Sequence, residues 1–132
     1  MKYLLDTHVW IWALEKPEEL PTRVRDELFK LENMPFGLSV ISVWEASKKE
    51  SIGKLKLSCP IQNWFSSAIR DPFIQLQPLS VDVAQESNHL PGEFHRDPAD
   101  QMIVATARLQ RLTLITADQR IIAYPHVRCL WG

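Results

Sequence analysis

The stretch that decides the fold is RDPADQMIVATARLQRLTLITAD, residues 96–118. Asp97 followed by Pro98 is typical of a helix start, because an aspartate caps free N–H groups and proline fits the first helical position. Apolar residues then recur at helical spacing as far as Gln110. Residues 112–116 are rich in β-forming side chains, which predicts a strand. A helix that leads directly into a strand indicates an α/β protein.

The same alternation continues on both sides of this stretch. Short apolar runs predict strands over residues 2–5, 38–41, 73–79, 112–116 and 127–131. Amphipathic segments predict helices over residues 9–14, 22–31, 42–53, 60–70, 81–90, 97–110 and 118–123. We therefore expect an α/β fold with a mainly parallel five-stranded sheet and right-handed crossovers. The proline near the end of 73–79 is typical of an edge strand, and Asp71-Pro72 should end the helix before it.

Length and charge limit the classes of protein that fit. The 132 residues predict a single domain, residues 1–132, since single domains run ~100 to 200 residues. The net charge of -1 means that any contact with nucleic acid must be local. The longest apolar run, residues 9–14, is far shorter than the ~20 residues that span a membrane, so we expect a cytoplasmic protein with no membrane association. Cys59 and Cys129 form no Cys-x-x-Cys pair and predict small core residues.

Four acidic residues stand at the predicted carboxyl ends of strands or in the helices beside them. Asp6 ends the first strand, and Glu45 lies in the first turn of the helix after the second. Asp100 begins the helix that leads into the fourth strand, and Asp118 follows that strand by two residues. Because ligands bind beyond the carboxyl ends of parallel strands, we expect these four carboxylates to share one edge of the sheet.

Such a cluster is unfavourable without a counter-charge. Two carboxylates 4 Å apart repel by about 4 kcal/mol at an effective dielectric of 20, so protons or a cation must compensate. Mg²⁺, or Mn²⁺ in its place, prefers oxygen ligands and binds a few carboxylates together with substrate phosphate. We expect Asp6, Asp100 and Asp118 to hold this ion. Glu45 then completes the site or orients a water that such a metal site can activate.

Two of the acids also have a structural interpretation. Ser42 and Glu45 match the capping box of a helix start. Asp100 falls in a first helical turn, where the helix dipole favours negative charge. For Asp118, by contrast, a box formed by Thr116 and Gln119 already satisfies the helix start. Asp6 follows a buried strand, where an unpaired charge is costly.

Four motifs of the chain resemble, in order and spacing, those of the PIN-domain ribonucleases, and most closely the VapC toxins of bacterial toxin–antitoxin pairs. The motifs are Leu4-Leu5-Asp6-Thr7, Ser42-Val43-Trp44-Glu45, residues 96–107 and Leu114-Ile115-Thr116-Ala117-Asp118. The resemblance covers essentially the whole chain. It implies a three-layer α/β/α PIN-like fold in which the first strand is central.

The resemblance also implies a function and a set of site residues. The expected activity is that of a Mg²⁺-dependent endoribonuclease, which hydrolyses phosphodiester bonds of RNA and acts as a toxin. The protein is expected to form a homodimer and to be inhibited by a small antitoxin protein whose tail enters the acidic pocket. The metal-binding acids of the family correspond to Asp6, Glu45, Asp100 and Asp118. Asp97 and Thr116 are then accessory residues beside the ligands.

RNA must approach an acidic pocket, so cations at its rim are needed to hold the flanking phosphates. The candidates are Lys48, one turn after Glu45, and His95 and Arg96, which precede the acidic helix. Lys49 is interpreted as a solvated side chain. The five tryptophans are assigned to the core or a dimer interface rather than to base stacking.

Two other functions remain open. A catalytically silent PIN-like domain would bind RNA or a partner without cleavage, although the intact acids favour a nuclease. A metal-dependent phosphatase of the haloacid-dehalogenase type also begins with an aspartate at a strand end. It requires a second acid two positions later, where this chain has His8, which we expect to be packed against the sheet edge.

Overall fold

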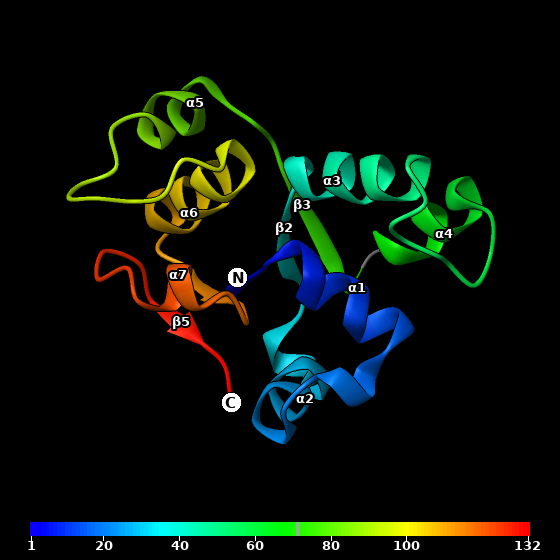
Figure 1. The fold of residues 1–132 in the computed structure, drawn as a ribbon. Helices are drawn as coiled ribbons and strands as arrows, with labels where there is room; N and C mark the ends of the chain where they lie inside the picture. Colours follow the sequence, from blue (N-terminus) through cyan, green and yellow to red (C-terminus); the bar gives the residue numbers. More distant parts are fainter. Residues whose placement is uncertain (71) are drawn as a thin grey trace.

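Five parallel strands form the centre of the molecule in the computed structural model, which describes residues 1–70 and 72–132 (Figure 1). The strands are β1 (Tyr3–Leu5), β2 (Phe36–Ser39), β3 (Ile74–Gln77), β4 (Thr113–Ile115) and β5 (Cys129–Leu130). Their order is β3-β2-β1-β4-β5, and each neighbouring pair is parallel. The first strand is therefore central and β3 is an edge strand, as the sequence predicts.

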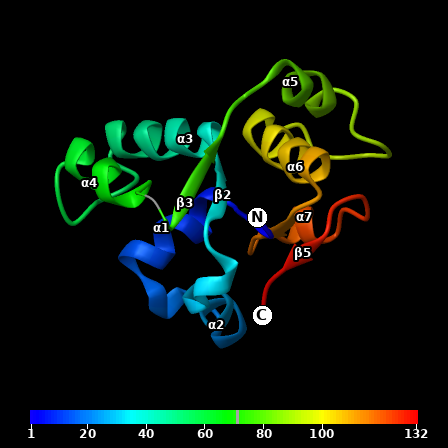
Figure 2. The same ribbon diagram turned by 180° about the vertical axis from the view of Figure 1, so that it is seen from behind.

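Helices cover both faces of this sheet and complete a three-layer α/β/α fold. They are α1 (Thr7–Glu15), α2 (Thr22–Phe29), α3 (Val40–Ser51), α4 (Ile61–Ala68), α5 (Val81–Ser87), α6 (Pro98–Gln110) and α7 (Gln119–Ile122), with 3-10 turns at Pro17–Glu19 and Leu31–Asn33. In both ribbon views, α5, α6 and α7 lie on one side of the molecule and α1, α2 and α4 on the other (Figures 1 and 2). Within the described residues, every helix is too short or too polar to cross a membrane.

The two faces of the sheet carry separate apolar cores because neighbouring residues of a strand point to opposite faces. Tyr3 and Leu5 join the core formed with α1, α2 and α4. Leu4 joins the core formed with α6 and α7. At the centre of the first core, the fully buried Trp10 donates its indole N–H to the backbone oxygen of Ala68 at 2.9 Å, which ties α1 to α4. The two cores hold β1 in place from both faces, and this also fixes the position of Asp6, the residue after the strand.

The second strand and the helix after it begin earlier than predicted. β2 covers Phe36–Ser39, and the run 38–41 is split between strand and helix. The buried Ser39 caps α3 by accepting a hydrogen bond from Ile41 N at 3.2 Å. The capping box assigned to Ser42 and Glu45 is therefore wrong, and Glu45 lies in the second turn of α3. Local β propensity suggested a strand that continues to Ile41, whereas the cap at Ser39 ends it there and starts the helix.

Other local expectations have mixed outcomes. The helix start at Asp97-Pro98 is confirmed, because Asp97 Oδ1 accepts a hydrogen bond from Asp100 N at 3.1 Å. The expectation that Cys59 belongs to the core is wrong, since this thiol is exposed just before α4. The α4 helix is shorter than residues 60–70, and Asp71, expected to help end it, lies outside the described residues.

Candidate active site

Asp6 stands at the centre of the carboxyl edge of the sheet. It follows β1, which lies between β2 and β4, the position in a parallel sheet where connections diverge and ligands bind. Asp6 is only 3% exposed and caps α1, because its Oδ1 accepts from Thr7 N at 2.8 Å. Its Oδ2 accepts from the hydroxyl of Thr116 at 2.7 Å. Two donors thus fix the orientation of a buried carboxylate.

Thr116 links the ends of β1 and β4. The side chain is fully buried, and besides donating to Asp6 it accepts a hydrogen bond from Asp118 N at 3.0 Å. Asp118 itself caps α7 by accepting from Arg120 N at 2.9 Å. The capping box assigned to Thr116 and Gln119 is therefore wrong. Thr116 instead positions two of the predicted site acids relative to each other.

Glu45 reaches the same edge from the second turn of α3. Its Oε1 accepts from the hydroxyl of the buried Thr7 at 2.5 Å, and that hydroxyl also lies 2.7 Å from Ser42 Oγ. Burial, together with repulsion from Asp6 and Asp100, raises the pKa of Glu45 above its usual value. Glu45 on α3 is therefore close enough to Asp6 and Asp100 for their charges to affect its pKa.

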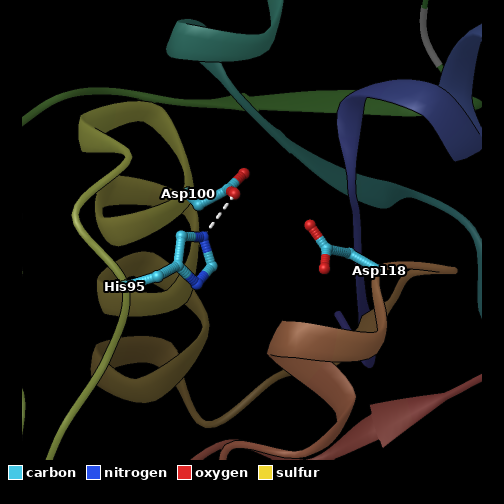
Figure 3. A group of neighbouring side chains, drawn as sticks. All are labelled: His95, Asp100 and Asp118. Atoms are coloured by element: carbon cyan, nitrogen blue, oxygen red, sulfur yellow. Dashed lines mark hydrogen bonds and ion pairs between the residues drawn. The ribbon is translucent and has the colours of Figure 1, made fainter.

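Asp100, His95 and Asp118 form the tightest group of ligand-type side chains in the described residues (Figure 3). Each offers an atom that lies within 4.8 Å of those of the other two. His95 Nε2 donates to Asp100 Oδ2 at 2.7 Å. Burial and the charges of Asp6 and Asp97 nevertheless raise the pKa of Asp100. His95 thus lies within the acidic cluster, although the sequence placed it at the rim.

Arg120 is the main residue of this cluster that sequence reasoning missed. Its Nη2 lies 3.1 Å from Asp118 Oδ2 and 3.5 Å from Asp100 Oδ2, although 61% of the side chain is exposed. Desolvation alone would raise the pKa of Asp118, but the hydrogen bonds from Arg120 hold that pKa below its usual value. An arginine on a short surface helix carries no sequence signal for such a bridge between two acids.

His8 packs beside Asp6, in agreement with the sequence analysis. Its Nε2 accepts a hydrogen bond from Ala117 N at 2.9 Å, so a neutral ring carries its proton on Nδ1, 3.7 Å from Asp6 Oδ2. The ring lies against Trp12 and Trp131. Burial lowers the pKa of His8 even though the nearby acids oppose that shift. A neutral His8 leaves the charge of Asp6 uncompensated.

Basic and aromatic side chains surround the acids. Lys48 and Arg96 are exposed. The charge of Lys49, one turn after Glu45 on α3, lowers the pKa of Glu45, so the structure favours Lys49 as the lysine nearest the acids. Trp44 is 59% exposed, so it is not a core residue, and of the two positions expected for the tryptophans only a dimer interface is left for it.

The donor set suits a hard divalent cation. Burial, with added repulsion from neighbouring acids, raises the pKa values of Glu45 and Asp100, so these two carboxylates lack a full counter-charge in the protein itself. Mg²⁺ and Mn²⁺ prefer oxygen ligands, and an imidazole such as that of His95 is compatible with Mn²⁺. The acidic cluster can therefore hold a metal ion between Asp100 and Asp118.

Fold and site together define an α/β domain with an acidic, metal-compatible centre at the carboxyl edge of a parallel sheet. The sequence model of the PIN domain family matches residues 3–127. The chain belongs to this family.

Individual proteins agree with this assignment. Ribonuclease VapC22 of Mycobacterium tuberculosis (strain ATCC 25618 / H37Rv) is 26% identical over 125 residues, which cover 95% of this chain and 93% of that protein. The crystal structure of VapBC2 from Rickettsia felis, bound to a promoter DNA fragment, matches with a TM-score of 0.74, 19% identity and full coverage of both chains. FitAcB from Neisseria gonorrhoeae matches with a TM-score of 0.61 and 22% identity over 97% of this chain and 96% of that one. These structures share the fold.

Removal of one buried charge should stabilise the metal-free protein. In EDTA, we expect Glu45→Gln to raise the free energy of unfolding at neutral pH, because the amide keeps an acceptor for Thr7 and ends the repulsion from Asp6 and Asp100. The folded-state pKa of Glu45 lies above its reference value of 4.5. The gain should therefore be small below pH 4.5, grow as the pH rises from there and level off above the folded-state pKa.

Urea unfolding at several pH values, followed by circular dichroism, measures this difference. Asp82→Asn, at an exposed acid of α5, is the matched control and should change stability little. A wild-type protein that is more stable than Glu45→Gln at neutral pH in EDTA would show that Glu45 is not repelled by its neighbours.

Proposed function

We propose that this chain is a metal-dependent endoribonuclease and the toxin of a toxin–antitoxin pair. The observation that carries the proposal is the convergence of Asp6, Glu45, Asp100 and Asp118 on one sheet edge, where burial and mutual repulsion favour a bound cation. The name of the relative, Ribonuclease VapC22, supports the same activity. Phosphodiester hydrolysis requires that negative charge on the phosphate be neutralised and that a water be positioned in line with the leaving group.

In this proposal each acid has a separate task. Asp6, Asp100 and Asp118 hold the ion, which is Mg²⁺ or Mn²⁺ and supplies Lewis-acid polarisation and charge neutralisation at the phosphate when bound. Glu45 is positioned by Thr7 and accepts a proton from the attacking water, a task for which a raised pKa is suited.

Other residues position these acids and the RNA. Thr116 orients Asp6 and Asp118, and Asp97 supports the helix start that carries Asp100. Cations at the rim, namely Lys48, Lys49 and Arg96, contact the flanking phosphates. His95, which donates to Asp100, is placed either to coordinate the ion or to donate to an RNA phosphate. The cytoplasmic location expected from the sequence stays a prediction.

A small antitoxin protein is the proposed partner, as in the VapBC complexes whose toxins share this fold. Besides the acidic site that its tail would enter, the chain offers an apolar hollow of about 230 Å³. Leu14 of α1 and Phe29 of α2 are exposed large hydrophobic residues among its walls. Arg25 Nε in the same hollow is buried and has no hydrogen-bond partner among the described residues. An apolar antitoxin segment with one acceptor would satisfy both features.

A homodimer is also proposed. Large apolar side chains are exposed on α3, on edge strand β3, in the connection after β3 and at the start of α5, namely Val40, Trp44, Leu76, Leu79 and Val81. An edge strand flanked by exposed apolar residues is a natural place for association of a second copy.

The nuclease proposal predicts that one buried carboxylate decides activity. Asp6→Asn should keep the fold and reduce metal-dependent RNA cleavage by at least about a hundredfold, since loss of a charge-stabilising group typically costs this much. Cleavage of labelled single-stranded RNA in Mn²⁺ or Mg²⁺, with EDTA as the metal-free arm, is the measurement. Asp82→Asn should cleave as the wild type does. Undiminished cleavage by Asp6→Asn excludes this site, and Mn²⁺ binding without cleavage of diverse RNAs favours a catalytically silent binding module.

The antitoxin proposal predicts that capture depends on the apolar hollow. A short protein encoded next to this gene should co-purify with the wild type, and Phe29→Glu should reduce its recovery at least about tenfold by placing a charge on the interface. Because Phe29 is 75% exposed, the substitution should leave the thermal midpoint of the free chain unchanged. Phe29→Leu keeps an apolar side chain and is the control. Equal recovery with Phe29→Glu would rule the hollow out as the anchor.

The dimer proposal predicts a mass of twice 15.3 kDa in solution. Val81→Glu should shift the purified protein toward the monomer, because a residue that is 82% exposed tolerates charge in the monomer and not in an apolar interface. Light scattering coupled to size exclusion measures both proteins. A wild-type monomer at all concentrations, or a dimer that Val81→Glu leaves intact, contradicts this arrangement.

A further inference from the structure

A basic hollow lies at the opposite end of α6 from the acidic site. Asp100 stands in the first turn of α6, and the hollow, with a volume of about 520 Å³, adjoins the last turn. Its walls include Arg108, Arg111, His126 and Arg128. Figure 1 shows the loop between α7 and β5, which carries His126, beside this end of α6.

The basic side chains of the hollow outnumber the acids that pair with them. Arg108 donates to Glu86 at 2.8 Å and to the backbone oxygen of His126 at 2.6 Å. Arg128 donates one Nη2 hydrogen bond to the backbone oxygen of Arg111 at 2.8 Å. Because Glu86 is the single carboxylate paired with these arginines among the described residues, the hollow is locally positive in a chain whose net charge is -1.

Arg111 is the residue that stability alone does not explain. It follows the last residue of α6 with φ 56° and ψ 41°, the left-handed conformation in which helices usually place glycine. Its guanidinium makes no hydrogen bond or ion pair with any described residue. Arg108 and Arg128 donate hydrogen bonds to backbone carbonyls near this helix end. Arg111, by contrast, has a strained backbone conformation, and its charged side chain lines the hollow without a partner among the described residues. Non-glycine residues in strained positions are concentrated at functional sites.

We propose that this hollow binds a phosphate group of the RNA strand whose scissile bond lies in the acidic site, an inference that rests on the proposed function. Arg111 follows Asp100 by eleven positions, which corresponds to a rise of about 16 Å along a helix. The rim cations serve the phosphates beside the scissile bond, whereas phosphates farther along the strand are repelled by the acids and need a positive contact away from them. The planar guanidinium forks of arginine match phosphate oxygens in geometry and charge.

The test separates RNA binding from RNA cleavage. Binding of a fluorescein-labelled single-stranded RNA of about 16 nucleotides, the upper end of the length that a small domain covers, is followed by anisotropy in EDTA. Arg111→Gly should weaken binding about threefold or more and reduce the slope of log affinity against log salt by about 0.7, the value for one lost phosphate contact. Its thermal midpoint should rise, because glycine relieves the left-handed strain.

Two further variants are controls. Arg111→Lys keeps the charge but loses the planar fork, so it should retain the wild-type salt slope and bind with an affinity between those of the wild type and Arg111→Gly. Arg23→Ala, at an exposed arginine of α2, removes the same charge elsewhere and should leave the affinity and the salt slope unchanged. A gain in stability together with a loss of binding is the pair of results that a merely structural Arg111 would not give.

Several outcomes would overturn the inference. Arg111→Gly that binds as the wild type does excludes the hollow, even if Asp6→Asn abolishes cleavage and the nuclease proposal stands. Equal weakening by Arg23→Ala assigns the effect to net charge. If Arg111→Gly weakens RNA binding but the wild type cleaves no RNA, the hollow is an RNA-binding site and the proposed nuclease activity is excluded.

Discussion

Repulsion between buried carboxylates at the carboxyl end of β1 is the constraint on which the rest of this structure depends. Burial and the charges of neighbouring acids raise the pKa values of Glu45 and Asp100, so the folded chain holds these groups in an arrangement that destabilises it. Two apolar cores fix β1 from both faces and place Asp6 in the middle of the cluster. The cores thus offset the cost of a site whose natural counter-charge is a cation.

Hydroxyl groups and one arginine make the arrangement geometrically specific. Thr7 holds Glu45, and Thr116 holds Asp6 while it receives the N–H of Asp118. Thr116 directly follows β4, and Thr7 begins α1 one residue after Asp6, so both are positioned by regular elements and not by long loops. Arg120 bridges acids of α6 and α7 at the exposed side of the cluster. The site therefore presents its charge from one direction, toward solvent, where a phosphate strand would approach.

Much of this arrangement could be predicted, because the site acids lie where strands end and helices begin, and these boundaries leave recognisable patterns in the sequence. The sheet and the helix start at Asp97 follow from periodicity and from proline and capping patterns, whereas the central place of β1 is implied by the resemblance to the PIN-domain family. The capping boxes around Glu45 and Asp118 were wrong because a buried serine and the acid itself serve as the caps. Arg120 could not be predicted, since its partners come together only in the tertiary fold. The exposure of Trp44 likewise depends on how α3 packs, and its helical pattern alone does not reveal it.

The central claim is that the separate acids share one cation site, and anomalous diffraction from crystals soaked in Mn²⁺ tests it most directly. The account predicts one or two anomalous peaks enclosed by the carboxylates of Asp6, Asp100 and Asp118, with His95 turned away from Asp100 or coordinating the ion. Peaks confined to other parts of the surface, or none at millimolar Mn²⁺ with the site open to solvent, would contradict it.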